Sequence, residues 1–332
     1  IYTLSLHDAL PIFEPTFITL ALVYAAVIAM GAYVIRLPHP DWTPTGAPRV
    51  GKKPAKVAIV GANVSANNAI RTPQFWLLWV ILFCNITAGI GILENAAPMV
   101  QDYFPALSAA AAAGFVGLLS LANMGGRFIW SSASDVIGRK NIYMVYLGAG
   151  LAFYFVLAVY GHTSLALFVG CALVLLSFYG GGFASIPAYL RDLFGVYQVG
   201  AIHGRLLTAW SAAGVAGPLI INTVVERQAS RGNSGPELYQ LSLYVMCVLL
   251  AMGLISNVLV RPVAQRWFED PDKVAAKVES DRAAVLGAQQ ESGGKTGAAH
   301  APVAGVLAVV IAALLVYGLW ETAVKASQMF AG

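Results

Sequence analysis

Long apolar segments recur along this chain and are separated by shorter polar connections. Eight of them reach the length of about 20 residues that an α-helix needs to cross the hydrocarbon core of a bilayer. They are residues 17–35, 75–100, 106–130, 142–160, 165–189, 206–225, 238–260 and 303–320. Barrel strands would alternate apolar and polar side chains over about ten residues, whereas these runs are continuous. The pattern predicts an all-α membrane protein.

Composition supports this fold class and narrows the function. Of the 332 residues, 58% are hydrophobic and 11% are charged, against about a quarter charged in a soluble domain. The histidines are scattered, and Cys84, Cys171 and Cys247 lie inside apolar runs, so no metal site or disulfide framework is expected. The sequence shows neither a phosphate-binding GxxxxGK[ST] loop nor a catalytic cluster. We therefore expect no cofactor, no nucleic-acid partner and no enzymatic activity.

The lysine and arginine positions predict the orientation. Cytoplasmic connections of membrane proteins carry an excess of these residues. All but three of the 20 fall in or beside residues 36–74, the turns after the third and fifth spans, and residues 262–302. The linkers 36–74 and 262–302 are therefore predicted to be cytoplasmic, in a multi-pass protein of the cell's inner (plasma) membrane.

These two linkers differ from the spans in composition. Residues 36–74 are rich in proline and basic residues, and residues 262–302 are polar and rich in alanine and glycine. Such composition favours solvated connections with little fixed structure over binding domains. We expect one exception, an amphipathic turn near residues 272–285.

One connection, SSASDVIGRKN at 131–141, is chemically specific. A short turn between two membrane helices must reverse tightly, which favours Gly138. Asp135 can pair with Arg139 or Lys140, or cap the positive N-terminus of the next helix. The alternative interpretation is an ordinary turn on the positively charged side of the membrane.

This turn resembles the loop signature of the major facilitator superfamily. The matching positions are Ser131, Asp135, Gly138, Arg139 and Lys140. Ser131 replaces the family's first glycine, and Val136 replaces its basic residue after the aspartate. Three longer stretches are similar to the oxalate:formate antiporter family within that superfamily: RTPQFWLLWVILFCNITAGIGILENAAPMVQ, NMGGRFIWSSASDVIGRK and SFYGGGFASIPAYLRDLFGVYQVGAIHGRLLTAWSAAGVAGP.

The resemblance covers about residues 17–261 and implies a fold of twelve helices in two six-helix halves. Residues 13–35 would then be helix six, and residues 36–74 the linker between the halves. Residues 75–261 would be the six-helix C-terminal half. The N-terminal half would be missing from this chain.

The two ends of the chain need separate interpretations. The stretch IYTLSLHDALPI at 1–12 can be encoded, codon for codon, by a common short-read sequencing adapter. We expect it to be a translated artefact, the alternative being a divergent N-terminus. Residues 303–332 resemble a small single-span subunit found beside such transporters, here fused to the C-terminus. A lipid-facing helix of no fixed role is the alternative.

Arg127 is the foremost candidate for binding, because an ionisable side chain inside a span is costly and usually functional. It lies eight residues before Asp135, about 12 Å deeper along the helix. Its planar fork could hold a carboxylate in the central cavity. The resemblance implies this role, since an arginine in helix eight is expected to hold the oxalate group. The alternatives are snorkelling to the cytoplasmic surface and bracing of Asp135.

Four further residues are candidates, with plain packing as the alternative for each. Asn123 lies one turn before Arg127, and Asn85 lies near mid-membrane. Tyr179 precedes Gly180–Gly182, a run that favours a helix break or close helix packing. The resemblance implies a lysine in helix eleven, but residues 206–225 contain no lysine or arginine, and Trp210 stands near its place. A single cation favours a monocarboxylate such as formate or lactate.

The sequence thus favours a secondary transporter that moves small organic anions by alternating access. Oxalate, formate or another mono- or dicarboxylate would be carried by antiport or proton symport. The expected partners are the small carboxylate, the lipid bilayer and the missing N-terminal half. A non-transporting sensor or scaffold of the same fold is the alternative, followed by a membrane-integrated enzyme.

Overall fold

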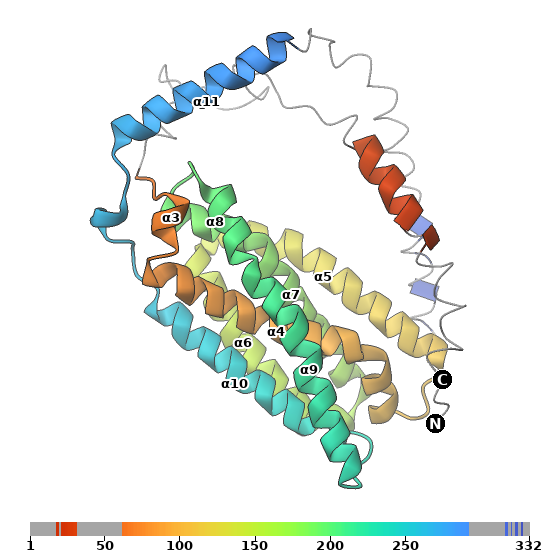
Figure 1. Ribbon diagram of the computed structural model, residues 1–332. Coiled ribbons are helices and arrows are strands. Elements are labelled where there is room, and N and C mark those ends of the chain that lie inside the picture. Colours follow the sequence, from red (N-terminus) through yellow and green to blue (C-terminus); the bar gives the residue numbers. More distant parts are fainter. Residues whose placement is uncertain are drawn as a thin grey trace. The chain divides into compact units, whose positions relative to one another are not determined.

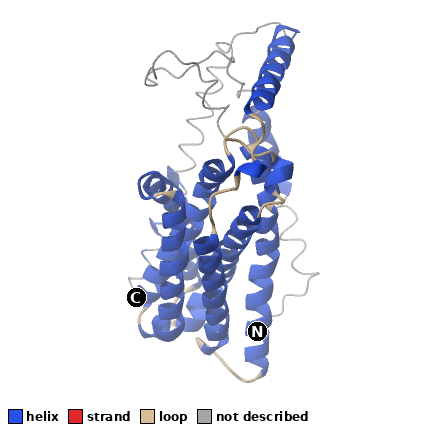
Figure 2. Cartoon of the chain, turned by 90° about the vertical axis from the view of Figure 1, so that its left-hand side faces the viewer, coloured by secondary structure: helices blue, strands red, loops and turns tan. Residues whose placement is uncertain are grey.

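The computed structural model describes residues 18–19, 21–31, 62–291 and, near the C-terminus, 316–317, 320, 323–324 and 327. Residues 73–259 form one bundle of long helices (Figure 1). Its long helices are α4 (Pro73–Tyr103), α5 (Ala109–Ile137), α6 (Arg139–Tyr160), α7 (Leu165–Phe194), α9 (Thr208–Ser230) and α10 (Glu237–Leu259). The shorter elements are α3 (Ala66–Ala69), η1 (Gly161–Thr163), α8 (Val199–Leu206), η2 (Gln265–Trp267) and α11 (Pro271–Glu291). Figure 2 shows these elements as helices joined by loops, which confirms the all-α fold class.

Six of the eight predicted spans are helices long and apolar enough to cross a membrane. The predicted span 206–225 is longer in the structure, because α8 continues into α9 and residues 199–230 form one crossing. The first predicted span is described only in part, where Ala21–Gly31 is a shorter apolar helix in a unit separate from the bundle. The predicted span 303–320 lies outside the described residues except for 316–317 and 320, which are helical. Residues 1–12 also lie outside them.

Local sequence determines where these helices begin and end. The hydroxyls of Thr72 and Ser108 cap α4 and α5 by accepting hydrogen bonds from the backbone N–H groups three residues later, at 3.3 and 3.2 Å. Gly138 (φ 91°) joins α5 to α6, and Gly195 (φ 83°) ends α7. Glycine enters positive φ without the steric penalty that a Cβ would bring. The turn at Gly138 can therefore reverse the chain between two membrane helices without a longer loop.

The closest packing in the bundle brings α5 against α7. A Cβ on Gly126 would overlap the main-chain oxygen of Ser177, and one on Gly180 would overlap that of Asn123. Small residues allow such backbone contact between membrane helices. α7 continues through Gly180–Gly182 without a break. Of the two alternatives for this glycine run, the structure therefore shows close packing.

Hydrogen bonds fix the two ends of the bundle. We call the end that holds residues 131–141 the linker end. There, Gln74 Nε2 at the start of α4 donates to Pro262 O at 3.1 Å, just past the end of α10. At the opposite end, the Tyr239 hydroxyl of α10 donates to Asp102 Oδ2 of α4 at 2.7 Å. The two helices are thus joined at both ends.

The described ends of both linkers have more fixed structure than the sequence predicted. The backbone N–H of Val64 donates to Phe194 O at 2.8 Å, and that of Glu269 donates to Asn63 O at 2.7 Å. The Asn63 side chain is 1% exposed, and its Oδ1 accepts from the backbone N–H groups of residues 196 and 197 at 3.0 and 3.1 Å. The turn after α7 has N–H groups that need partners, and the linker supplies them. The turn predicted near 272–285 is part of the longer helix α11.

Candidate functional site

Arg127 lies on an exposed side of α5, ten residues before the end of that helix at Ile137. Its Nε donates a hydrogen bond to Asn123 Oδ1 at 3.3 Å, one turn earlier in the same helix. Its guanidinium carbon lies 5.2 Å from the centroid of the Phe183 ring on α7, within the range of a cation–π interaction. A guanidinium carries five N–H donors, so the bond to Asn123 leaves others for an anion.

The direction of the Arg127 side chain bears on its alternative roles. The bond to Asn123 turns it toward the N-terminal end of α5, as helical side chains prefer. The linker end lies in the other direction, where Asp135 pairs with Arg139. Arg127 therefore points away from the linker end, and the partner of Asp135 is a different arginine.

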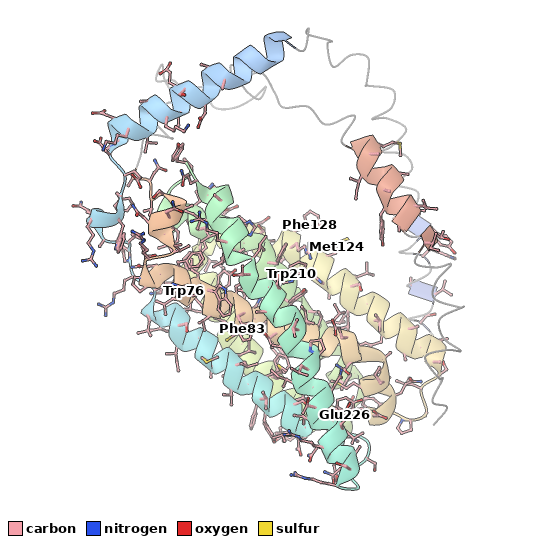
Figure 3. The ribbon with its side chains drawn as sticks, viewed as in Figure 1. Trp76, Phe83, Met124, Phe128, Trp210 and Glu226 are labelled. Carbon is pink, nitrogen blue, oxygen red and sulfur yellow. The ribbon has the colours of Figure 1, made fainter. Side chains whose placement is uncertain are left out.

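An aromatic pair extends this site from α7 to α9. The Phe183 and Trp210 rings lie 5.9 Å apart between centroids, and Trp210 is 44% exposed on α9 (Figure 3). Arg127, Phe183 and Trp210 therefore form a row across α5, α7 and α9, which we call the Arg127 row. The start of α9 is also tied to α4, because Trp79 Nε1 donates to Thr208 Oγ1 at 3.0 Å.

Phe183 was not among the residues that the sequence singled out. It lies one helical turn after Tyr179, at the end of the SFYGGGF stretch. An aromatic side chain on the far side of a glycine run was the available signal. The sequence could not say which of the two aromatics faces Arg127, because that depends on how α7 is rotated against α5.

Asn85 and Tyr179 lie in the interior of the bundle. Their side chains are 4% and 8% exposed. The Tyr179 ring fills the space beside Gly89 of α4, and the Asn85 amide lies against Gly182 of α7. Of the five binding candidates, the structure connects three: Asn123 bonds directly to Arg127, and Phe183 lies between Arg127 and Trp210.

Arg127 is also the cation farthest from the helix ends in the described spans. The other lysines and arginines of these spans are Arg139 and Lys140 in the first turn of α6, Arg191 in the last turn of α7, Arg205 in α8, and Arg227 in the last turn of α9. Among the acidic side chains of these spans, Glu94 on α4 and Glu226 on α9 are exposed. Within the described ranges there is no group of three residues that could hold a metal ion.

The 131–141 turn is a junction between three helices. The Ser134 hydroxyl donates to Ser131 O at 2.6 Å and accepts from Arg139. The Arg139 guanidinium also pairs with Asp135, and its Nε lies 3.7 Å from Asp192 Oδ2 near the end of α7. This arginine is only 9% exposed, so it joins α5, α6 and α7 from a partly enclosed position.

Lys140 connects the same turn to α10. Its Nζ donates to the main-chain oxygens of Val258 and Val260 at 3.0 and 2.7 Å. These carbonyls lie at a helix C-terminus, where cations are favoured and free acceptors need partners. Asn257 Nδ2 returns a hydrogen bond to Lys140 O at 2.9 Å. The turn therefore links α5, α6, α7 and α10 at the linker end.

Known proteins are similar in sequence to this chain over more than half of its length. The family model described as Major Facilitator Superfamily matches residues 4–218. The oxalate:formate antiporter of Oxalobacter formigenes is 28% identical over 206 residues, which are 60% of this chain and 45% of that protein. An uncharacterised transporter of the same type from Escherichia coli, YhjX, is 23% identical over 191 residues, 58% of this chain and 44% of that protein. The chain thus spans less than half the length of these curated relatives.

Proposed function

We propose that this chain, which belongs to the major facilitator superfamily, supplies the C-terminal half of a secondary transporter for small organic anions. Residues 75–261 would form that half, residues 36–74 the linker that precedes it, and residues 13–35 the last helix of the other half. The substrate would cross by alternating access between the two halves. The superfamily consists of transporters, which confirms the prediction that the chain is not an enzyme.

The observation that carries this proposal is the position of Arg127. Its guanidinium is exposed, lies away from the helix ends, and is held by Asn123 and Phe183. In a low-dielectric setting a charge without a partner is costly, so a face of this kind suits an anionic ligand. A carboxylate can accept two parallel hydrogen bonds from a guanidinium, which adds geometric specificity to the charge attraction.

The Arg127 row favours a monocarboxylate over a dicarboxylate. Beyond Arg127, the row continues with two aromatic rings and no second cation. A dianion would have one carboxylate facing an apolar surface, whereas formate or lactate would be neutralised by one arginine. The name of the relative from Oxalobacter contains both oxalate and formate. Of these two anions, we propose that this chain prefers formate. Exchange of two anions and symport with a proton both fit this face.

The membrane and the orientation follow from the same proposal. The chain is a multi-pass membrane protein, and we propose the cell's inner membrane with the linker end in the cytoplasm. Residues 303–332 would add one more helix, either a fused small subunit or a lipid-facing span.

Transport by the full-length protein tests the proposal. The gene would be recovered from the source DNA together with its upstream part. Its purified protein product would then be reconstituted into liposomes loaded with formate, lactate or oxalate. We expect exchange of labelled formate or lactate and little competition by oxalate. Preferred uptake of oxalate would contradict the monocarboxylate assignment. A protein that inserts and binds a carboxylate but moves none would instead be the sensor or scaffold.

A further inference from the structure

A small cavity lies inside the six-helix bundle, between α4, α6, α7 and α10. Its lining includes Asn85 and Gly89 of α4, Tyr146 and Tyr154 of α6, and Phe178 of α7, and all of these side chains are buried. The cavity volume is about 10 Å³, which is room for about one water molecule. The cavity is separate from the Arg127 row, whose residues do not line it.

Two polar atoms of the lining residues make no hydrogen bond of normal geometry within the described part of the protein. They are Asn85 Nδ2 and the Tyr146 hydroxyl. Their side chains are 4% and 1% exposed, so bulk solvent cannot reach them freely. A buried donor without a partner destabilises the folded state, and native structures rarely contain one that is not bonded to protein or ordered water.

Both atoms lie against the glycine run of α7, at adjacent positions of that helix. A Cβ on Gly181 would lie 2.9 Å from the Tyr146 hydroxyl, and one on Gly182 would overlap Asn85 Nδ2. The neighbouring tyrosine at the cavity is different, because the Tyr154 hydroxyl donates to Ala88 O at 2.6 Å. Among the lining side chains, Asn85 and Tyr146 therefore carry the polar atoms that still need a hydrogen-bond partner.

We propose that this cavity binds one water molecule, hydrogen-bonded to both Asn85 and Tyr146. Water donates and accepts, so it satisfies the tyrosine hydroxyl and the amide in either orientation. Buried waters usually make about three hydrogen bonds, and the lining offers polar groups on two helices. The water links α4 to α6 beside the glycine run of α7. Asn85 therefore has a structural role that does not depend on substrate.

The direction in which Tyr146→Phe changes thermal stability tests this site. Tyr146→Phe in the full chain, purified in detergent, removes the hydroxyl and nothing else. If the hydroxyl bonds a water, we expect the midpoint of thermal unfolding to fall. If it is unpaired, its removal relieves a desolvation penalty and the midpoint rises, which would overturn the proposal. Tyr154→Phe should lower the midpoint in either case, and Tyr160→Phe, at a 54% exposed position, should leave it unchanged.

A double-mutant cycle identifies the partner of that hydroxyl. With a shared water, Asn85→Leu and Tyr146→Phe should be non-additive, because either change removes part of the same hydrogen-bonded unit. The Ser185 hydroxyl on α7 is the competing hydrogen-bond partner for the Tyr146 hydroxyl. Coupling of Tyr146→Phe to Ser185→Ala alone, with none to Asn85→Leu, would mean a direct bond between the two hydroxyls and would overturn the water site.

Hydroxyl-radical footprinting by X-ray radiolysis gives a direct readout. Radicals formed from a bound water modify the nearest side chains, even where bulk solvent does not reach. We expect oxidation of Tyr146 in the full chain and its loss in the Asn85→Leu variant, whose larger apolar side chain fills the cavity. No oxidation of Tyr146 at doses that modify exposed Tyr160 would contradict the proposal.

Discussion

Gly180 of α7 lies directly against the main-chain oxygen of Asn123 on α5, with no room for a Cβ between them. This contact sets the spacing on which the candidate site depends. Asn123 holds Arg127 one turn later on α5, and Phe183 lies one turn after Gly180 on α7. The two helices must touch at this level for the Phe183 ring to meet the guanidinium.

Gly180→Ala tests this contact. The added methyl group would overlap the Asn123 carbonyl, so the helices must separate or shift. Overpacking of this kind typically costs about 1–3 kcal/mol, and we expect a lower unfolding midpoint for the purified chain. Gly170→Ala is the matched control, because it lies on the same helix with open space around it. An equal response of the two variants would show that the contact does not limit stability.

Arg127→Lys in the full-length transporter should weaken carboxylate binding. Lysine keeps the charge but loses the planar fork. Loss of a charge-assisted hydrogen bond costs about 1.5–3 kcal/mol, or roughly tenfold to a hundredfold in affinity. Equilibrium binding of labelled formate would measure the change, and Arg127→Ala should be weaker still. Unchanged affinity in Arg127→Ala would place the substrate cation elsewhere.

Phe183→Leu should have a smaller effect on the same measurement. It removes the cation–π contact with Arg127, which is worth about 0.5–1 kcal/mol at an exposed site, while the apolar volume is largely kept. We therefore expect roughly a two- to fivefold loss of affinity. Phe155→Leu, at a 51% exposed position on α6, should bind as the unsubstituted protein does. A loss as large as that of Arg127→Lys would mean that Phe183 contacts the substrate itself.

Asp135→Asn should slow transport without weakening substrate binding. It removes one of the two carboxylates near Arg139 but leaves Asp192, and it lies far along α5 from Arg127. The comparison needs two readouts on one preparation, namely the exchange rate in liposomes and the equilibrium affinity in detergent. A parallel fall in both would indicate that the turn and the Arg127 row are coupled.

Cysteine labelling tests the predicted orientation. Ser230 is exposed at the end of α9 opposite the linker end, and Ser280 is exposed on α11. In intact cells, an impermeant maleimide should modify Ser230→Cys and leave Ser280→Cys unmodified until the membrane is opened. The unsubstituted chain is the control for Cys84, Cys171 and Cys247. The reverse pattern would place the linker end outside.

Asn63→Ala tests the anchoring of the linker. The substitution leaves the N–H groups of Val196 and Tyr197 without their acceptor. A fully buried donor left unsatisfied costs about 1–3 kcal/mol, and the cost here should lie at the low end of that range, because Val196 is 37% exposed and water can replace part of the lost bond. We expect a lower unfolding midpoint and faster tryptic cleavage near Arg71. Asn67→Ala is the control, since this side chain is exposed and accepts a hydrogen bond from Arg205 at 2.8 Å on the protein surface.

The sequence by itself determined the membrane class, six spans and the position of the tight turn. Continuous apolar runs can satisfy their backbone hydrogen bonds in a bilayer only as helices or closed barrels, so composition and run length are sufficient evidence. The turn was predictable because Gly138 combines a short connection with a backbone that needs positive φ. Arg127 could be singled out because a charge inside an apolar span is rare for energetic reasons.

Tertiary structure alone decided which candidates meet. Asn85, Tyr179 and Arg127 all lie on apolar helices, and the rotation of each helix depends on packing partners far away in the sequence. Contact of Gly180 with Asn123 turned Phe183 toward Arg127 and buried Tyr179 against Gly89. Likewise, Asn63 is polar and lies in a linker, and only the free N–H groups after α7 explain why it is buried. Hydrophobic patterns report how much of a helix is buried, whereas side-chain volume across a helix interface decides which atoms touch.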